Sequence, residues 1–325
     1  MVVVAIISMF ACALLIVTNE AWGEAALSAS LEVVRQDACK PAQKVCTAAD
    51  AIVFVHGIYG GDGTFLNSTT NFDWPRHLPT HIANRAVDIF RLNYTTALLA
   101  WAKEKNPDFP TVAKDIYAAM TPLRKRQYRS IGFIAHSLGG NVVSTYIHMV
   151  KTTLGHPQRS QHAFVITLAT PVLGSHIADL ADVLKSTLNI NDDLLKSLMK
   201  DDLYLRMLLE FRKEENAKQA HYSCRPVHLH AAFEEKYLGP LLIVNRDSAA
   251  LSISDIADSR IVGFPLNHSA IAKPDGPTHD VYRWVLSRID DEYSRLSMWE
   301  ASHTLLPPKR RLCELIDFVP EGDVR

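Results

Sequence analysis

The sequence lacks the features of fibrous, repetitive and nucleic-acid-binding proteins. Its 14 glycines and 16 prolines follow no period, and it contains no low-complexity tract. Neither sign of charge dominates, because 34 Lys and Arg residues stand against 35 Asp and Glu residues. These absences exclude solenoid and fibrous classes, and no nucleic-acid partner is expected.

Cysteine is scarce, and no two cysteines stand in a Cys-x-x-Cys pair, so no metal site is predicted. Beyond residue 23 the chain contains Cys39, Cys46, Cys224 and Cys313. An even number of cysteines suits an oxidising compartment. Three pairing schemes are possible, and a bond between Cys39 and Cys46 would be the most local.

The N-terminal segment carries no charged residue from Val2 to Thr18. This apolar run is shorter than the ~20 residues that a spanning helix needs, and Ala21 and Gly23 supply the small residues of a cleavage site. Residues 1–23 are therefore predicted to be a signal peptide of a secreted, periplasmic or lumenal protein. Because no Lys or Arg precedes the run, a membrane anchor formed by residues 2–18, or a buried helix, is the alternative.

The chain has 325 residues and is 48% hydrophobic, enough for a sizeable core in one large α/β domain or two small ones. Short apolar runs alternate with longer helical patterns, which favours a mostly parallel sheet with helices on both faces. The predicted strands are 51–56, 86–92, 131–136, 163–169, 226–233 and 240–245, and a helix is predicted at about 280–296.

The predicted organisation is one domain at 50–298, with an N-terminal extension at 24–49 and a C-terminal tail at 299–325. Residues from about 176 to 222 have helical spacing of Leu, Ile and Met among many charges. They are interpreted as an insertion into the domain rather than as a second domain.

A candidate nucleophile stands where the strand at 131–136 meets a helical pattern. Ser137 lies at this turn, with Ala135 two residues before it and Gly139 two residues after it. A nucleophile elbow needs small residues at both places, and Ala135 replaces the glycine of the commoner G-x-S-x-G form. The helix would also direct the Leu138 N–H toward a developing oxyanion. The alternative is a serine that only caps the helix.

A second signal lies at the end of the first predicted strand, where His56-Gly57-Ile58-Tyr59-Gly60-Gly61 follows an apolar run. A His-Gly turn at this place can supply the other oxyanion N–H, here from Ile58. A phosphate-binding loop is excluded, because no Gly-Lys-Ser/Thr follows and no G-x-G-x-x-G frame fits residues 57–63.

These segments resemble the α/β-hydrolases, in the lipase-like group that includes the serine-active-site-containing proteins and the GPI-inositol-deacylase-like lipases. The resemblance covers about residues 50–290 and rests on VFVHGIYGG, WPRHLP, IFRLNY, IGFIAHSLGGNVV, ITLATPVLGS and NHSAIAKP. It implies an α/β-hydrolase fold in which the helical insertion forms a lid, although the insertion could also pack as ordinary core. Val172 departs from the pattern, since the group usually has a histidine after Thr-Pro.

A serine hydroxyl needs a base to accept its proton, and in this fold the order along the chain is serine, acid, histidine. The loop before the terminal helix leaves His268 and His279 as candidates. The resemblance favours His268, which matches the family's catalytic histidine, whereas His279 stands at a predicted helix start. His136, adjacent to Ser137, is interpreted as a packing or hydrogen-bonded neighbour.

The acid is expected after the strand at 226–233, and similarity to the group favours Glu234. Glu235 and Asp247 are the alternatives. Asp247 follows the next predicted strand, and two glutamates at a strand end can simply be solvated.

The sequence therefore predicts an exported serine hydrolase that cleaves a carboxylic ester, lipid-like in character, through an acyl-enzyme and without a metal or organic cofactor. A thioesterase, an amidase or an acyltransferase could use the same residues, and a catalytically silent hydrolase-fold binding protein is the alternative of another class. The expected partner is a small ester or lipid-like substrate. Contact with a membrane surface stays open, and no oligomeric state is indicated.

Overall fold

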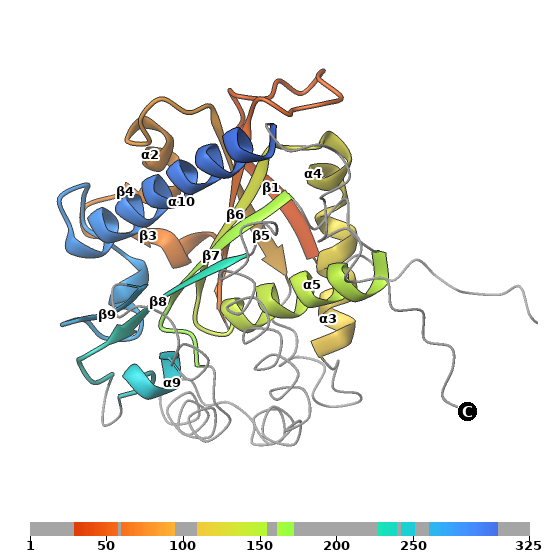
Figure 1. Ribbon diagram of the computed structural model, residues 1–325. Helices are drawn as coiled ribbons and strands as arrows, with labels where there is room; N and C mark the ends of the chain where they lie inside the picture. Colours follow the sequence, from red (N-terminus) through yellow and green to blue (C-terminus); the bar gives the residue numbers. More distant parts are fainter. Residues whose placement is uncertain are drawn as a thin grey trace, which may run out of the picture.

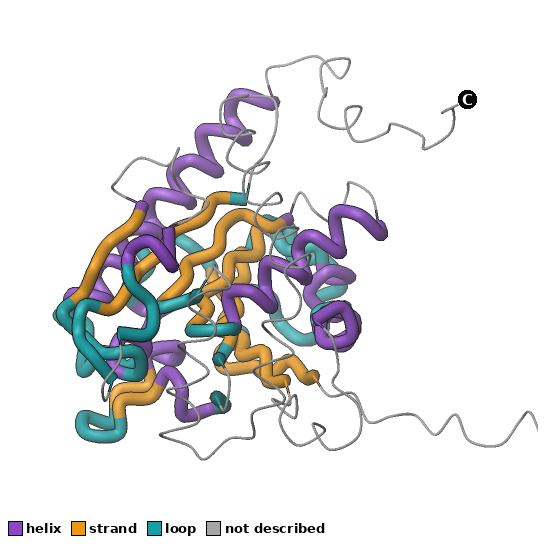
Figure 2. The backbone as a smooth tube through the Cα atoms, turned by 90° about the horizontal axis from the view of Figure 1, so that it is seen from below, coloured by secondary structure: helices purple, strands orange, loops and turns teal. Residues whose placement is uncertain are grey.

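The computed structural model describes residues 29–57, 60–94, 109–154, 161–171, 227–238, 242–250 and 260–304. These parts form a central sheet flanked by helices, as Figures 1 and 2 show from two directions. The predicted signal peptide, the insertion at 176–222 and the tail beyond residue 304 lie outside the described residues.

The main sheet is mostly parallel, as predicted. Its strands are β1 (Ala29–Arg35), β2 (Asp50–Val55), β5 (Val87–Tyr94), β6 (Ser130–His136), β7 (His162–Leu168), β8 (His228–Glu234) and β9 (Ile261–Phe264). They are ordered β1-β5-β2-β6-β7-β8-β9 across the sheet, and only the β1–β5 pair is antiparallel. β2 and β7 are buried along their whole length, because helices cover both faces of a parallel sheet.

Helices lie on both faces of this sheet (Figure 1). Phe133 of β6 contacts Tyr146 of α5 (Gly139–Leu154), with ring centroids 6.0 Å apart. Phe164 of β7 contacts Tyr293 of α10 (Asp280–Thr304) at the same separation, 6.0 Å. Because Gly132 pairs with Phe164 and successive strand residues alternate in direction, these two contacts lie on opposite faces.

The remaining described elements surround this core. They are η1 (Asp62–Phe65), β3 (Leu66–Asn67), β4 (Phe72–Asp73), α2 (Trp74–His77), η2 (Leu78–Thr80), α3 (Phe109–Ala119), α4 (Thr121–Arg126), α9 (Arg246–Ala250) and η7 (Ala270–Ala272). α3 packs on α5, and Trp74 of α2 packs between Phe54 of β2 and Tyr282 of α10. None of the helices in the described part of the chain is long and apolar enough to cross a membrane.

One strand predicted at the edge of the sheet was wrong. Residues 242–245 form no strand, and the edge strand is β9 instead. Ile243 and Val244 are buried as a strand would be, but their N–H groups donate to the carboxylate of Glu234 and not to a neighbouring strand. A short apolar run shows burial without showing where its hydrogen bonds go.

The segment expected as an N-terminal extension contributes β1, which joins the sheet beside β5. Its cysteines Cys39 and Cys46 form a disulfide, the most local of the expected pairings. The carboxylate of Asp88 on β5 accepts hydrogen bonds from the main-chain N–H groups of Ala38 (2.8 Å) and Cys39 (2.9 Å), so the disulfide loop is tied to the sheet. At the other end, α10 continues to Thr304, beyond its predicted end.

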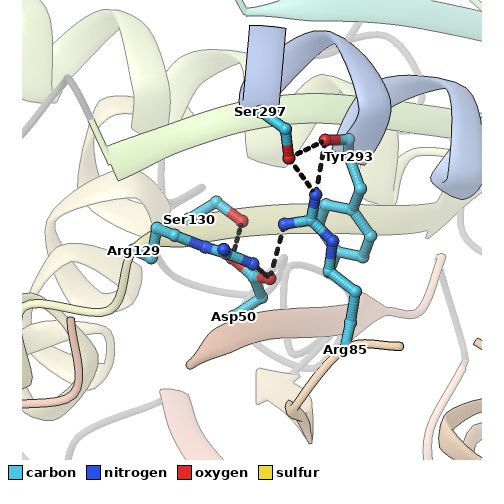
Figure 3. A network of polar contacts seen from close by, with 6 residues as sticks. All are labelled: Asp50, Arg85, Arg129, Ser130, Tyr293 and Ser297. Carbon is cyan, nitrogen blue, oxygen red and sulfur yellow. Dashed lines mark hydrogen bonds and ion pairs between the residues drawn. The ribbon is translucent and has the colours of Figure 1, made fainter. Parts of the chain in front are cut away.

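A buried polar network joins the amino ends of β2 and β6 to α10 (Figure 3). Asp50 is fully buried, accepts a hydrogen bond from the Ser130 hydroxyl (2.7 Å) and forms ion pairs with Arg129 and Arg85. Arg85 also donates to the main-chain oxygen of Tyr293 (2.6 Å). A buried carboxylate is tolerated when cations and donors surround it in this way. The network lies at the amino ends of the strands, opposite the carboxyl ends where the site described next is formed.

Candidate active site

Ser137 occupies a strained turn between β6 and α5. Its φ of 53° lies in the left-handed region, which a residue with a Cβ adopts at a cost of order 1–3 kcal/mol when the surroundings impose it. Three contacts impose it here. The Ser137 N–H donates to the Leu168 oxygen (2.9 Å), and its own carbonyl accepts from the Gly140 N–H (3.1 Å) and the Thr170 hydroxyl (2.8 Å).

Small residues around the turn allow the chains to approach closely. A Cβ on Gly139 would collide with the main-chain oxygens of Val55 and His56, and a Cβ on Gly57 would lie 2.6 Å from the Cβ of Ser137. Ala135 is fully buried, and its methyl group is accommodated where the commoner pattern has glycine. The turn therefore has the geometry of a nucleophile elbow.

His268 lies beside this serine, on the loop between β9 and η7. Its Nε2 is 3.0 Å from the Ser137 Oγ, and its Nδ1 is 2.8 Å from Oε2 of Glu234. A carboxylate only accepts hydrogen bonds, so Nδ1 carries the proton and Nε2 is left free to accept one from the serine hydroxyl. All three side chains are buried.

Glu234 is the last residue of β8, and its carboxylate is completely surrounded. Oε1 accepts hydrogen bonds from the N–H groups of Ile243 (2.7 Å) and Val244 (3.0 Å), while Oε2 faces His268. These donors compensate for the burial of the charge. Sequence pattern does not reveal these two amides, because they come from a loop whose apolar run predicts a strand.

The other candidates lie elsewhere. Glu235 is exposed, and its main-chain N–H donates to Phe264. The side chain of Asp247 in α9 lies outside the described part. His279 accepts a hydrogen bond from the Val281 N–H through Nδ1 (3.3 Å) at the start of α10, consistent with a capping residue.

The loop after β2 approaches the same place. His56 donates from Nδ1 to the Gly57 oxygen (2.8 Å) and stacks on Tyr94 with ring centroids 4.4 Å apart. Burial lowers the pKa of His56, so the ring is neutral, and the Tyr94 hydroxyl holds the His56 carbonyl at 2.6 Å. Leu138 is buried between the serine and the start of α5, whereas Ile58 falls outside the described residues.

The sheet carries a serine at a left-handed turn after β6, a carboxylate at the end of β8 and a histidine after β9, all at the carboxyl edge of its parallel strands. The chain has the α/β-hydrolase fold. Within the described ranges, no group of three His, Cys, Asp or Glu side chains could hold a metal ion.

Comparison with known proteins gives a family match over part of the chain. Residues 102–219, which include Ser137, match a family model described as "Putative serine esterase (DUF676)". No curated protein matches the sequence.

Several solved structures are similar to this chain at low sequence identity. A structure from a study of two fungal esterases from Rhizomucor miehei is 16% identical, with a TM-score of 0.49, and the match covers 85% of this chain and 84% of that one. Esterase B from Lactobacillus rhamnosis is 12% identical, with a TM-score of 0.49 and coverage of 93% and 97%. The Vlm2 thioesterase domain is 14% identical, with a TM-score of 0.40 and coverage of 81% and 97%.

Proposed function

We propose that this protein is a serine hydrolase that cleaves carboxylic esters through an acyl-enzyme. The observation that carries the proposal is the continuous hydrogen-bond chain from Ser137 through His268 to Glu234, formed at a strained elbow. The family match to serine esterases over the segment that contains Ser137 supports it. A serine that only capped a helix would need neither the buried histidine nor the carboxylate behind it.

The proposed reaction follows from the roles of these atoms. As the Ser137 Oγ attacks the ester carbonyl carbon, His268 Nε2 takes the hydroxyl proton, and Glu234 stabilises the resulting imidazolium. The carbonyl electron pair moves to the oxygen, which the N–H groups of Leu138 and Ile58 would bind. When the intermediate collapses, the alcohol leaves with the proton from His268. A water molecule then repeats the sequence, releasing the acid and restoring Ser137.

We propose a lipid-like ester as the substrate, in keeping with the lipase-like group that the sequence resembles. The same residues could cleave a thioester or an amide, or pass the acyl group to an acceptor other than water, because these reactions differ in the pocket and in water access. We also propose that the protein is exported, with residues 1–23 as signal peptide. The Cys39–Cys46 disulfide supports this proposal, since such bonds persist in oxidising compartments.

The test is hydrolysis of p-nitrophenyl esters of rising chain length, alongside a matched thioester and anilide, by the wild type and by Ser137→Ala. We expect Ser137→Ala and His268→Ala each to lower kcat by about 10⁴-fold or more, because members of one catalytic unit act together. His279→Ala, which removes only a helix cap, should stay within a few-fold of the wild type.

A fluorophosphonate probe provides a second readout that does not depend on the right ester. Wild-type protein should be labelled covalently at Ser137, and the Ser137→Ala variant should not. Near-normal esterase activity in Ser137→Ala would overturn the assignment of the nucleophile. Absence of both hydrolysis and labelling in the wild type would instead support a silent binding protein.

A further inference from the structure

His136 is a histidine of the site that the proposed reaction does not use. It is the last residue of β6 and directly precedes Ser137. Its Nε2 lies 2.8 Å from the main-chain oxygen of His268, and the centroids of the two imidazole rings are 5.0 Å apart. The residue before the proposed nucleophile is thus bonded to the backbone of the proposed base.

The direction of this hydrogen bond is determined by its acceptor. A carbonyl oxygen only accepts, so His136 donates from Nε2. Burial, together with the neighbouring His268, lowers the pKa of His136 to about 3. The ring is therefore neutral at neutral pH, and it holds the carbonyl without placing a positive charge beside an imidazole that must itself become charged.

The loop that carries His268 is otherwise anchored away from the serine. The Leu266 oxygen accepts from the Lys236 N–H (3.1 Å), and the Asn267 side chain accepts from the Ala270 N–H (2.9 Å). The ring of His268 does contact Ser137, but that contact changes each time the proton moves. The bond from His136 is a contact between this loop and the elbow that does not change with the charge of His268.

We propose that His136 is a positioning residue, which ties the main chain of the base to the end of β6, directly before the nucleophile, and so maintains the Nε2–Oγ distance. The inference rests on the proposed function. Its physical basis is that proton transfer needs a separation of about 2.6–3.2 Å, and that a displacement of about 1 Å can lower a rate by about 10²-fold.

Three variants separate the hydrogen bond from the bulk of the side chain. His136→Phe keeps a ring of similar size but has no donor, and His136→Met is a second, flexible variant without a donor. His136→Gln keeps a neutral N–H donor that can reach the same carbonyl. Thermal unfolding of each variant shows whether it is folded, and the Met variant serves if the Phe variant is not.

Two readouts are measured for each folded variant: kcat and KM for the best p-nitrophenyl ester, and the second-order rate of fluorophosphonate labelling at Ser137. We expect the donor-free variant to lose about 10- to 100-fold in both kcat and labelling rate, with KM within about twofold of the wild type. The Gln variant should recover most of the loss. A role in packing alone would not be rescued by a donor of different shape.

Equal labelling rates for the wild type and a folded donor-free variant would overturn the inference while leaving the proposed function intact. Equal losses in the donor-free and Gln variants would also overturn it, since the hydrogen bond would then not be what matters. If wild-type Ser137 is neither labelled nor active on any ester, the proposed function fails, and the inference fails with it.

Discussion

At the scale of single residues, the buried carboxylate of Glu234 has protein hydrogen-bond partners where a solvated carboxylate would have water. Both of its oxygens have partners, and one of them binds two main-chain N–H groups. An amide side chain at position 234 could not satisfy all of these donors, because its own N–H group would face another N–H group. The carboxylate thus orients the imidazole of His268 and holds the loop at 243–244 at the same time.

We predict that Glu234→Gln lowers kcat by at least ~10²-fold, because the charge that stabilises the imidazolium is lost. It should also destabilise the fold by about 1–3 kcal/mol, since a buried hydrogen-bond partner is removed. Steady-state kinetics and urea unfolding measure the two effects. Glu235→Gln is the matched control, because Glu235 is the adjacent residue and is exposed.

The competing assignment of the acid is tested by Asp247→Asn, which we expect to leave kcat within a few-fold of the wild type. A severe loss in Asp247→Asn or Glu235→Gln, together with near-normal turnover in Glu234→Gln, would show that Glu234 is a structural carboxylate and not the acid of the triad.

At the scale of elements, β8 is held to α10 at the end opposite Glu234. His228 and His230 point to the same side of the strand, and both bind the carboxylate of Glu292 on α10, His230 through Nε2 at 2.7 Å. Burial raises the pKa of Glu292, but the hydrogen bonds and charges of the two histidines outweigh it and lower this pKa to about 2. The strand that presents the proposed acid is therefore joined to α10 by hydrogen bonds from two histidines to one buried carboxylate.

We predict that Glu292→Gln lowers the free energy of unfolding by about 1–3 kcal/mol at pH 7. A carboxyl whose pKa is lower when folded stabilises the protein above its unfolded pKa of 4.5, and this contribution is lost as the pH falls toward about 2. The difference between the variant and the wild type should therefore shrink below pH 4.5. Urea unfolding at several pH values measures it.

Asp291→Asn is the control on the same helix, because this carboxylate is 45% exposed and its ion pair with Arg288 should contribute less than about 1 kcal/mol. A Glu292→Gln effect that is the same at pH 7 and pH 3 would contradict a stabilising role for the Glu292 charge.

At the scale of the whole molecule, the N-terminal part is built into the sheet from Ala29 onward. β1 pairs with β5, and the Cys39–Cys46 loop is fastened to Asp88 on the same strand. Cleavage after Gly23, as the proposed export requires, would leave all of these contacts intact.

We predict that the mature protein begins near Glu24 and that Cys39 and Cys46 resist alkylation until a reductant is added. In the proposed export, the small residues Ala21 and Gly23 would determine the cleavage point, and the disulfide would form after export. Mass spectrometry of the protein purified from its native source measures both. A retained Met1 with membrane-bound activity would favour an anchor formed by residues 2–18.

The sequence by itself determined the central strands and the location of the elbow. β2, β6 and β7 are largely apolar runs because both faces of a parallel sheet are buried, and such runs can be recognised locally. β5 was recognised as well, although Asp88, Arg91 and Asn93 interrupt its apolar residues. The turn at Ser137 is equally local, since small residues two positions away on either side are a requirement of its own geometry.

The tertiary structure decided which polar groups meet, where the sequence and its resemblance to a family had offered candidates. Glu234 and His268 are 34 residues apart and His268 and Ser137 are 131 residues apart, so periodicity in the sequence carries no information about their contacts. Periodicity does not show the hydrogen-bond partner of the run at 240–245 either, so the run was wrongly predicted to be a strand. The bond from His136 to the carbonyl of His268 could not be predicted either. The local pattern of residues indicates which segments are buried. The partner of each hydrogen bond instead depends on which distant loops come together at the edge of the sheet.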